Sequence, residues 1–425
     1  MPRPQPPAHP VPLRHHPCAL CKVHFMAMWN PPAAAAQSPP SAAWQAPTEI
    51  ERKLYEAKAR GDWVGYFDVL ADCDLFVSMP RRDADGHDTG PPLSYWSPVV
   101  GQWCEVVQTE GVLPAPVPDP VFGLLSLGDF AESWGNDERW LAVNPGTPYE
   151  AYFPPNPGLW KAHADRAKGS DVQRGTLRTL RVGAPLQGPV AHGLGCGALM
   201  NVTNGALWNA MGTHGNGYFL ERHSLERWWG VTDRSSWRNA LDGLLKGRGV
   251  RGPWEFVLEV RAALSQQFGG QVDPALWRET AEKALLHSAA ESGGTVSDAQ
   301  VAGVKQLIGR ITRYEGRFRA DGILAANSRV RSALAWDYGR ASCMARWGIG
   351  ARFTDIPEAE EAVMQVCRLS QMTYNSWEEF AAGYILGRCL HFDDEQFGHW
   401  YTEMLHAHRV LATHAESPWR TVSWV

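Results

Sequence analysis

The sequence predicts an α+β protein, in which an N-terminal α/β domain with a small sheet precedes a mostly α-helical C-terminal domain. Most short strand-like runs fall within residues 74–143, whereas helical periodicity with little strand signal extends from Gly193 to the end of the chain. A length of 425 residues exceeds the roughly 150 of a single domain. The hydrophobic content of 44% is ordinary for a globular protein.

The first elements follow a proline-rich segment. Residues 1–46 hold 11 of the 31 prolines and show no helical or strand period, which predicts a disordered tail. The α/β domain is expected at residues 47–157. Thr48 with Glu51 fits a capping box that opens a first helix, and a second short helix follows Gly61. Four strand-like runs come next, at residues 74–79, 103–108, 122–127 and 139–143.

Residues 50–157 resemble the SseB-type N-terminal domain. The resemblance rests on the opening helix pair, on Leu75-Phe76-Val77, and on the segment from Arg139 to Gly146, which reads RWLAVNPG. It implies an α/β module of the kind found in proteins linked to serine sensitivity and to secretion systems. That family has no established catalytic residues, so the resemblance implies a fold without a reaction.

Residues 158–192 are polar, with one strand candidate at 176–182, and are interpreted as a connecting segment. Residues 193–425 are predicted to be helical, and Asp355 with Glu358 and Ser376 with Glu379 fit capping boxes. The expected helices cover residues 198–210, 224–229, 234–246, 254–267, 274–290, 297–319, 328–347, 357–372, 377–390 and 394–412.

The helical part resembles the domain-of-unknown-function family numbered 1266, from about Gly193 to the C-terminus. The matching segments are 228–233 (WWGVTD), 336–340 (WDYGR) and 376–380 (SWEEF), and the last continues through Gly383-Tyr384 and Gly387-Arg388. This resemblance implies a fold but no biochemical role.

The strongest candidate site consists of charged residues on apolar helix faces. At ~100° per residue, Asp337 and Arg340 fall within an apolar face and can pair with each other, and Arg388 projects from the apolar face of a later helix. Charges in an apolar interior must be paired or line a wet cavity. The three residues are therefore either a buried polar network or a pocket for a carboxylate or phosphate. The expected aromatic surround is Trp336, Trp347, Trp377 and Tyr384.

Two other patterns suggest metal binding but favour simpler interpretations. His399, Glu403 and His406 share a helical stripe that lies opposite the apolar face, so we expect solvent exposure; His408 is the inward histidine. Cys18 and Cys21 are spaced as a zinc pair, but the proline-rich context indicates incidental spacing. We therefore predict no metal site.

Three further groups are interpreted as structural. Residues 193–197 (GLGCG) lack the features of a phosphate loop and are expected to form a close-packed helix entry. The acidic run 393–395 is expected to be a solvated cap at a helix N-terminus. Cysteines within helices are expected to be core thiols: Cys343, Cys367 and Cys389.

Composition and the missing motifs limit the function. A net charge of -5 argues against nucleic-acid binding, and no apolar run approaches the ~20 residues of a membrane span. No standard catalytic motif occurs, and we expect no cofactor. The sequence therefore favours a cytoplasmic, non-catalytic interaction or adaptor protein with an unknown protein partner, linked to a secretion or toxin–immunity system. The alternative is a small-molecule enzyme or anion sensor that uses Asp337, Arg340 and Arg388.

Overall fold

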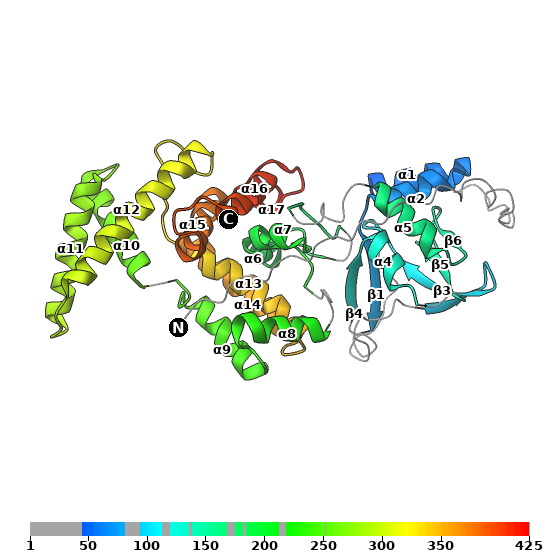
Figure 1. Ribbon diagram of the computed structural model, residues 1–425, viewed down its shortest axis with the longest axis horizontal. Coiled ribbons are helices and arrows are strands. Elements are labelled where there is room, and N and C mark those ends of the chain that lie inside the picture. Colours follow the sequence, from blue (N-terminus) through cyan, green and yellow to red (C-terminus); the bar gives the residue numbers. More distant parts are fainter. Residues whose placement is uncertain are drawn as a thin grey trace, which may run out of the picture. The chain divides into compact units, whose positions relative to one another are not determined.

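The computed structural model describes most of the chain after the proline-rich segment (Figure 1). The described residues are 45–80, 94–112, 120–135, 138–167, 175–181, 184–211, 218–250 and 252–424. The chain divides into two units, Met1–Gln45 and Ala46–Val425. All but the last two residues of the expected tail, and with them Cys18 and Cys21, lie outside the described residues.

The N-terminal part contains a four-stranded sheet with the strand order β2-β3-β5-β6. The β3–β5 pair is parallel and the two outer pairs are antiparallel. Two further strands, β1 and β4, form a separate antiparallel pair. The bounds are β1 Leu75–Pro80, β2 Ser94–Ser97, β3 Gln102–Val107, β4 Pro120–Leu125, β5 Trp140–Val143 and β6 Ala151–Phe153.

Four helices of the described residues accompany these strands: α1 Glu49–Arg60, α2 Trp63–Ala71, α4 Leu127–Ser133 and α5 Pro157–Arg166. Thr48 caps α1 by accepting a hydrogen bond from the backbone N–H of Ile50. Phe153 of β6 packs against Phe67 of α2, with ring centroids 4.5 Å apart. Trp160 of α5 is fully buried. α5 therefore contributes to this core, although residues from 158 onward were expected to form only a connection.

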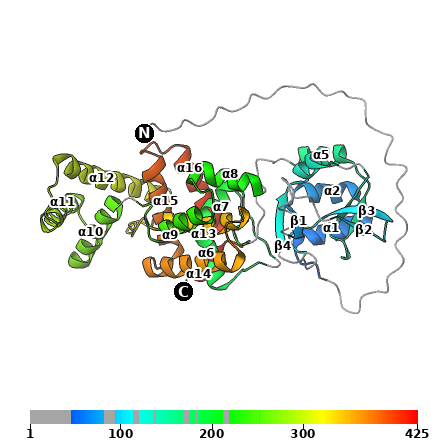
Figure 2. The same cartoon turned by 90° about the horizontal axis from the view of Figure 1, so that it is seen from below.

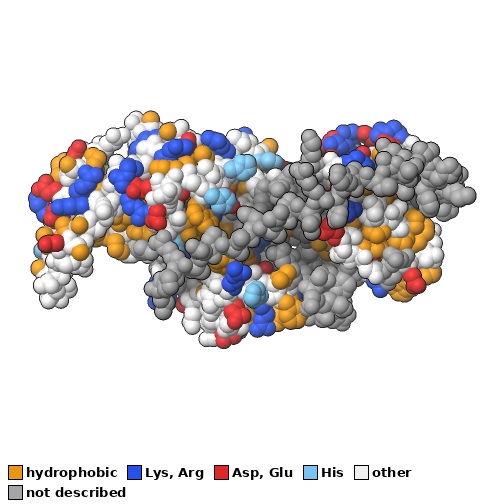
Figure 3. Space-filling view, in the orientation of Figure 1, with side chains coloured by type: hydrophobic (Ala, Val, Ile, Leu, Met, Phe, Trp, Pro, Cys, Tyr) orange, Lys and Arg blue, Asp and Glu red, His pale blue; other side chains and the backbone are white. Residues whose placement is uncertain are grey.

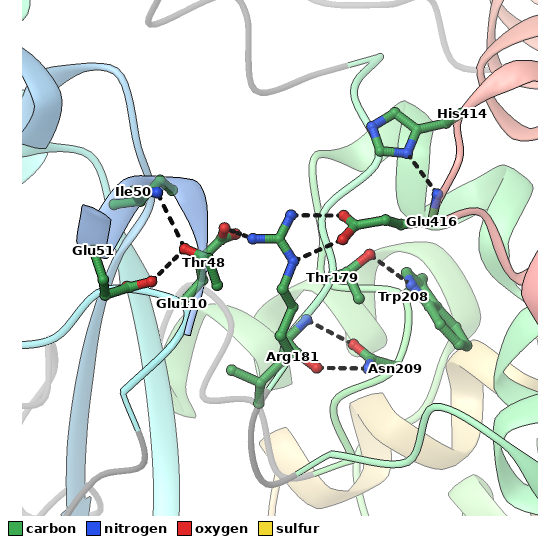
Figure 4. A network of polar contacts seen from close by, with 11 residues as sticks. Thr48, Ile50, Glu51, Glu110, Thr179, Arg181, Trp208, Asn209, His414 and Glu416 are labelled. Atoms are coloured by element: carbon green, nitrogen blue, oxygen red, sulfur yellow. Dashed lines mark hydrogen bonds and ion pairs between the residues drawn. The ribbon is translucent and has the colours of Figure 1, made fainter. Parts of the chain in front are cut away.

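Arginines of the segment 175–181 form ion pairs with residues that precede the segment and with a residue near the C-terminus. Arg181 pairs with Glu110 on one side and with Glu416 on the other, with an Nη2–Oε2 distance of 2.7 Å to Glu416 (Figure 4). Arg178 pairs with Asp74. The predicted strand at 176–182 is wrong, because the described part of it forms a single bridge between Arg178 and Leu207.

The remaining described residues form helices and their connections, as the sequence predicts (Figure 1). Their bounds are α6 Gly188–Cys196, α7 Ala198–Asn204, α8 Tyr218–Trp229, α9 Arg234–Leu245, α10 Gly252–Phe268, α11 Pro274–Glu291, α12 Asp298–Ala320, α13 Ala335–Gly350, α14 Ile356–Thr373, α15 Trp377–Phe392, α16 His399–Thr413 and α17 Pro418–Thr421.

The centre of the helical part is α13, in which 14 of 16 residues are buried. A helix that is apolar or small on every side indicates packing against several neighbours. The two residues that are not fully buried are Arg340 and Trp347. The site residues predicted at 336–340 therefore lie on the most enclosed helix of the protein.

Glycines bring α13 and α15 close together. A Cβ added to Gly339 would lie 2.5 Å from Cε2 of Tyr384 and 2.7 Å from the carbonyl oxygen of Cys196. A Cβ added to Gly387 would lie 2.7 Å from Cβ of Trp336. Both separations are far below ordinary carbon contact distances. The α13–α15 contact therefore requires residues without a side chain at these positions.

Two alanine substitutions test this packing with opposite expected signs. Gly339→Ala should lower the free energy of unfolding by about 1–3 kcal/mol, because Tyr384 and the backbone at Cys196 must shift. The matched change Gly316→Ala lies in α12, where no atom is within 4 Å of the new Cβ. It should raise the free energy of unfolding by about 0.5–1 kcal/mol, because alanine favours a helix more than glycine does. Chemical denaturation measures both; equal effects would contradict the close packing.

Candidate functional site

Asp337 and Arg340 form a buried ion pair on consecutive turns of α13. Asp337 is fully buried, and its carboxylate contacts Nη2 of Arg340. The other carboxylate oxygen accepts backbone hydrogen bonds from Gly249 at 2.8 Å and from Val250 at 2.9 Å. Burial raises the pKa of Asp337, while Arg340 and the two N–H groups act in the opposite direction.

Aromatic rings complete the surroundings of Arg340. Its guanidinium carbon lies 3.5 Å from the ring centroid of Trp336 and 5.6 Å from that of Trp229. Its Nε donates to the carbonyl oxygen of Trp336 at 3.2 Å. This geometry is that of a cation–π contact, which stabilises a charge that has lost most of its water.

Arg388 does not join this pair. Its Nη2 lies 2.7 Å from Oε2 of Glu403, and its guanidinium carbon is 5.1 Å from the ring centroid of Trp400. Glu403, which was expected to be solvent-exposed, is half-buried by this contact, with 28% of its side chain exposed. A helical wheel gives only the angle of each side chain about its own helix axis. It cannot show that Glu403 of α16 lies beside Arg388 of α15.

The four predicted aromatic residues do not all surround the Asp337–Arg340 pair. Trp336 stacks on Arg340, and Tyr384 is fully buried against Gly339. Trp347 lies 6.0 Å from Trp229. Trp377 packs elsewhere, stacked on His192 at 4.7 Å and in edge contact with Trp424 at 4.8 Å.

The charges of the two ion pairs, Asp337–Arg340 and Arg388–Glu403, balance within each pair. Each arginine has a carboxylate partner, so neither pair carries a net charge for an anion to neutralise. Tyr384 OH and Arg388 Nε are buried without a hydrogen-bond partner among the described residues. Both pairs are therefore charge-neutral, and the interpretation of these residues as a buried polar network stays a prediction.

Two buried charge clusters were missed at the sequence level. Arg261 donates to Glu315 at 2.9 Å, and Arg261 and Glu315 also bond the carbonyl oxygen and the N–H of Val330. Arg346 donates to the carbonyl oxygens of Leu207 and Ala210. Arg261 and Glu315 both lie at apolar helical spacing, so the reasoning that found Asp337 also applies to them.

The histidine stripe of α16 is divided between two contacts. His399 lies 3.7 Å from Glu403, and His406 Nε2 lies 2.8 Å from the carbonyl oxygen of Gly175. Figure 3 shows histidine side chains gathered over α16. Within the described ranges, no three His, Cys, Asp or Glu side chains are grouped to hold a metal ion.

The acidic run after α15 was predicted incorrectly. Asp394 and Glu395 have positive φ angles of 46° and 61°, so α16 begins at His399 instead of at Asp394. Asp393 is buried and accepts hydrogen bonds from Tyr314 OH and from two backbone N–H groups. Glu395 pairs with Arg313 at 2.6 Å. Together these carboxylates attach the loop to α12 instead of forming a solvated cap.

The remaining predicted groups lie inside the packing. Residues 193–197 end α6, and a Cβ at Gly193 would lie 2.1 Å from the carbonyl oxygen of Val363. Cys343, Cys367 and Cys389 are buried free thiols. Burial raises the pKa of Cys343 to about 11, which keeps it protonated near neutral pH.

Comparison with known proteins identifies one family. Residues 224–424 match the model of a family described as "Protein of unknown function (DUF1266)". The C-terminal helical part is therefore similar to that family, over a range that begins later than the expected Gly193. No curated protein and no solved structure matches the chain. The match does not reach residues 50–157, so the SseB resemblance stays a prediction.

No helix in the described part of the chain combines the length and apolar composition that a bilayer crossing requires.

Removing Arg340 should destabilise the protein. Arg340→Ala leaves Asp337 buried with only its backbone donors, which is expected to cost about 3 kcal/mol in the free energy of unfolding. The control Arg368→Ala removes an ion pair to Glu361 whose side chains are 56% and 62% exposed, and should change stability by less than about 0.5 kcal/mol. A variant at Arg340 that melts like the wild type contradicts the structural role.

The buried His408 predicts a loss of stability in acid. Burial lowers the pKa of His408 from 6.5 to about 4. As the pH falls, the unfolded chain therefore binds a proton at this histidine before the folded chain does. The contribution of neutral, buried His408 to the free energy of unfolding is complete above about pH 6.5 and is lost as the pH falls toward 4. The difference corresponds to about 3 kcal/mol. Denaturation as a function of pH should show this extra loss in the wild type and not in His408→Gln; parallel curves would contradict it.

Proposed function

We propose that this protein is a non-catalytic interaction protein whose helical domain binds a protein partner through the outward face of α8. The observation that carries the proposal is the exposure of this helix. Only Leu225 of α8 is buried, whereas Phe219, Leu220 and Trp228 are 51%, 56% and 69% exposed. Large apolar side chains that are exposed along one helix can mark a binding surface.

The three side chains share one half of the helix surface. At ~100° per residue, Phe219, Leu220 and Trp228 fall within about 180°, and Leu225 falls in the other half. His223 and Arg227 lie between them on the outward half. Figure 3 shows hydrophobic side chains beside basic ones and a histidine over α8. The outward half of α8 therefore carries both apolar and basic side chains.

Charge indicates the kind of partner. Arg227 lies over the ring of Trp228 at 5.0 Å, and the two carboxylates of α8, Glu221 and Glu226, flank the outward half about 20° beyond its two borders. A basic and aromatic stripe of this kind complements a segment that carries apolar side chains flanked by carboxylates. We therefore expect the partner to present an acidic amphipathic helix.

The interior of the helical domain supports this choice over the alternative. Asp337 and Glu403 each neutralise one of the arginines that an anion sensor or enzyme would use. The alternative proposal, a small anionic ligand bound at Asp337, Arg340 and Arg388, would show itself as a rise in melting temperature with added inorganic phosphate. Our proposal expects no such rise.

The proposal extends to the cellular setting. An SseB-type module at residues 50–157 is consistent with a role alongside a secretion or toxin–immunity system. Six cysteines among the described residues are free thiols, which suits the reducing cytoplasm. We therefore propose a cytoplasmic adaptor with a protein partner.

Affinity purification with paired variants tests the function. The full chain should retain a partner in constant proportion, and Phe219→Ser with Trp228→Ser should reduce recovery at least about tenfold, since a central aromatic contact is worth roughly 2 kcal/mol or more. The matched control is Phe268→Ser on α10, where Phe268 is 60% exposed away from α8. Equal recovery with the α8 variant, or no partner retained by the wild type, would contradict the proposal.

A further inference from the structure

The outward side of α11 carries a stripe of side chains that no described element covers. The stripe repeats at spacings of three and four residues along the helix and consists of Leu276, Glu279, Lys283, Leu286 and Ala290. At ~100° per residue these positions fall within an arc of about 80°. Leu276 and Leu286 are 37% and 47% exposed, and Ala290 is exposed as well. The side chains of Glu279 and Lys283 are 61% and 71% exposed.

The opposite side of the helix attaches α11 to its neighbours. Trp277 and Ala281 are buried, and Nε1 of Trp277 donates to the carbonyl oxygen of Val257 in α10 at 2.7 Å. Lys305 of α12 pairs with Glu282 at 2.7 Å. In both views α10 and α12 lie on the same side of α11 (Figures 1 and 2). These contacts hold the helix from behind, so the stripe has a fixed orientation.

The order of side chains along the stripe is self-complementary. When a second copy of α11 runs antiparallel with a twofold axis at the level of Ala281, residues equally far from position 281 lie opposite each other. Leu276 and Leu286 are each five residues from Ala281, and Glu279 and Lys283 are each two residues from it. A single axis therefore places leucine opposite leucine and, closer to the axis, carboxylate opposite ammonium.

We propose that α11 pairs with α11 of a second copy of this chain as an antiparallel helix pair. Each Lys283 then lies between Glu279 of its own helix, which it contacts at 2.6 Å, and Glu279 of the second copy. Two carboxylates and two ammonium groups alternate around the axis, with leucines on both sides of them. The contact is isologous, so it closes as a dimer.

Charge complementarity selects this occupant and this orientation. Charged residues within a helical seam are unfavourable against an apolar partner, but they specify register where opposite charges meet. The axis that pairs the leucines also pairs the opposite charges. A parallel pair in register would instead place Glu279 against Glu279 and Lys283 against Lys283. The stripe is therefore matched by its own copy in the antiparallel orientation.

The length of the seam predicts a weak dimer. α11 has 18 residues, which corresponds to about 27 Å. One helix per copy over this length is expected to bury less than the roughly 1,200 Å² at which standard interfaces begin. The dimer should therefore form at high concentration and dissociate on dilution.

Sedimentation of the full chain at increasing concentration tests the inference. The wild-type mass should rise from 47.1 kDa toward twice that value. Lys283→Glu places carboxylates opposite each other, and Glu279→Lys places ammonium groups opposite each other. Each variant should weaken self-association at least about tenfold, because repulsion replaces attraction on both sides of the axis.

The matched control is a charge reversal in another exposed pair. Lys246 contacts Asp242 at 3.0 Å on α9, and the two side chains are 57% and 62% exposed. Lys246→Glu removes a pair of the same kind as Lys283→Glu does, but at a different surface. This variant should therefore dimerise like the wild type.

An equimolar mixture of Lys283→Glu and Glu279→Lys tests the register directly. One copy then carries two carboxylates in the seam and the other carries two ammonium groups, so attraction across the axis is restored. The mixture should dimerise although neither variant does so alone. A variant that fails to fold cannot be restored in this way.

Three results would overturn the inference: a wild type that stays monomeric at several hundred micromolar, single variants that dimerise like the wild type, or a mixture that stays monomeric. Circular dichroism establishes that each variant is folded. If a charge variant does not fold, Leu286→Lys in the apolar part of the seam is used instead and should also be monomeric. Because no partner protein is needed, the outcome is independent of the function proposed for α8.

Discussion

The packing of α13 is the constraint on which the rest of the helical domain depends. A helix enclosed on nearly all sides needs neighbours that approach its backbone, and this approach requires small residues. Gly339 allows the ring of Tyr384 to lie against α13, and Gly387 allows α15 to lie against Trp336. Gly197 does the same for α7, where a Cβ would lie 3.1 Å from Sγ of Cys343. Interiors packed at this density tolerate little change in volume, so these positions act together.

Buried charges add orientation to this packing. Asp337 connects α13 to the backbone at Gly249 and Val250, and Arg346 connects the same helix to the carbonyl oxygens of Leu207 and Ala210. Each of these two side chains forms hydrogen bonds with backbone groups in a segment that connects helices. Such networks specify how elements meet more than they add to stability. In both cases a buried charge on α13 is bonded to the backbone of a connection that precedes it in the chain.

Two surfaces of the described residues carry exposed aromatic side chains. The outward half of α8 combines aromatic, aliphatic and basic side chains, and the β2–β3 hairpin combines an exposed tryptophan pair with an uncharged strand edge.

The fold class and the inward direction of the charges at 337 and 340 follow from the sequence alone, because helical periodicity and burial both depend on spacing along one element. It also carries the spacing signal for Arg261 and Glu315. The partner of Arg388 was decided only by tertiary structure, since Glu403 belongs to another helix and its contact depends on how α15 and α16 lie together. The same holds for the loop at 393–395, where bonds to Tyr314 and Arg313 stabilise a backbone that local propensity does not predict. Exposure of Trp96 and Trp103 was likewise decided by where the helical layer ends, a property of packing between distant segments that no local pattern encodes.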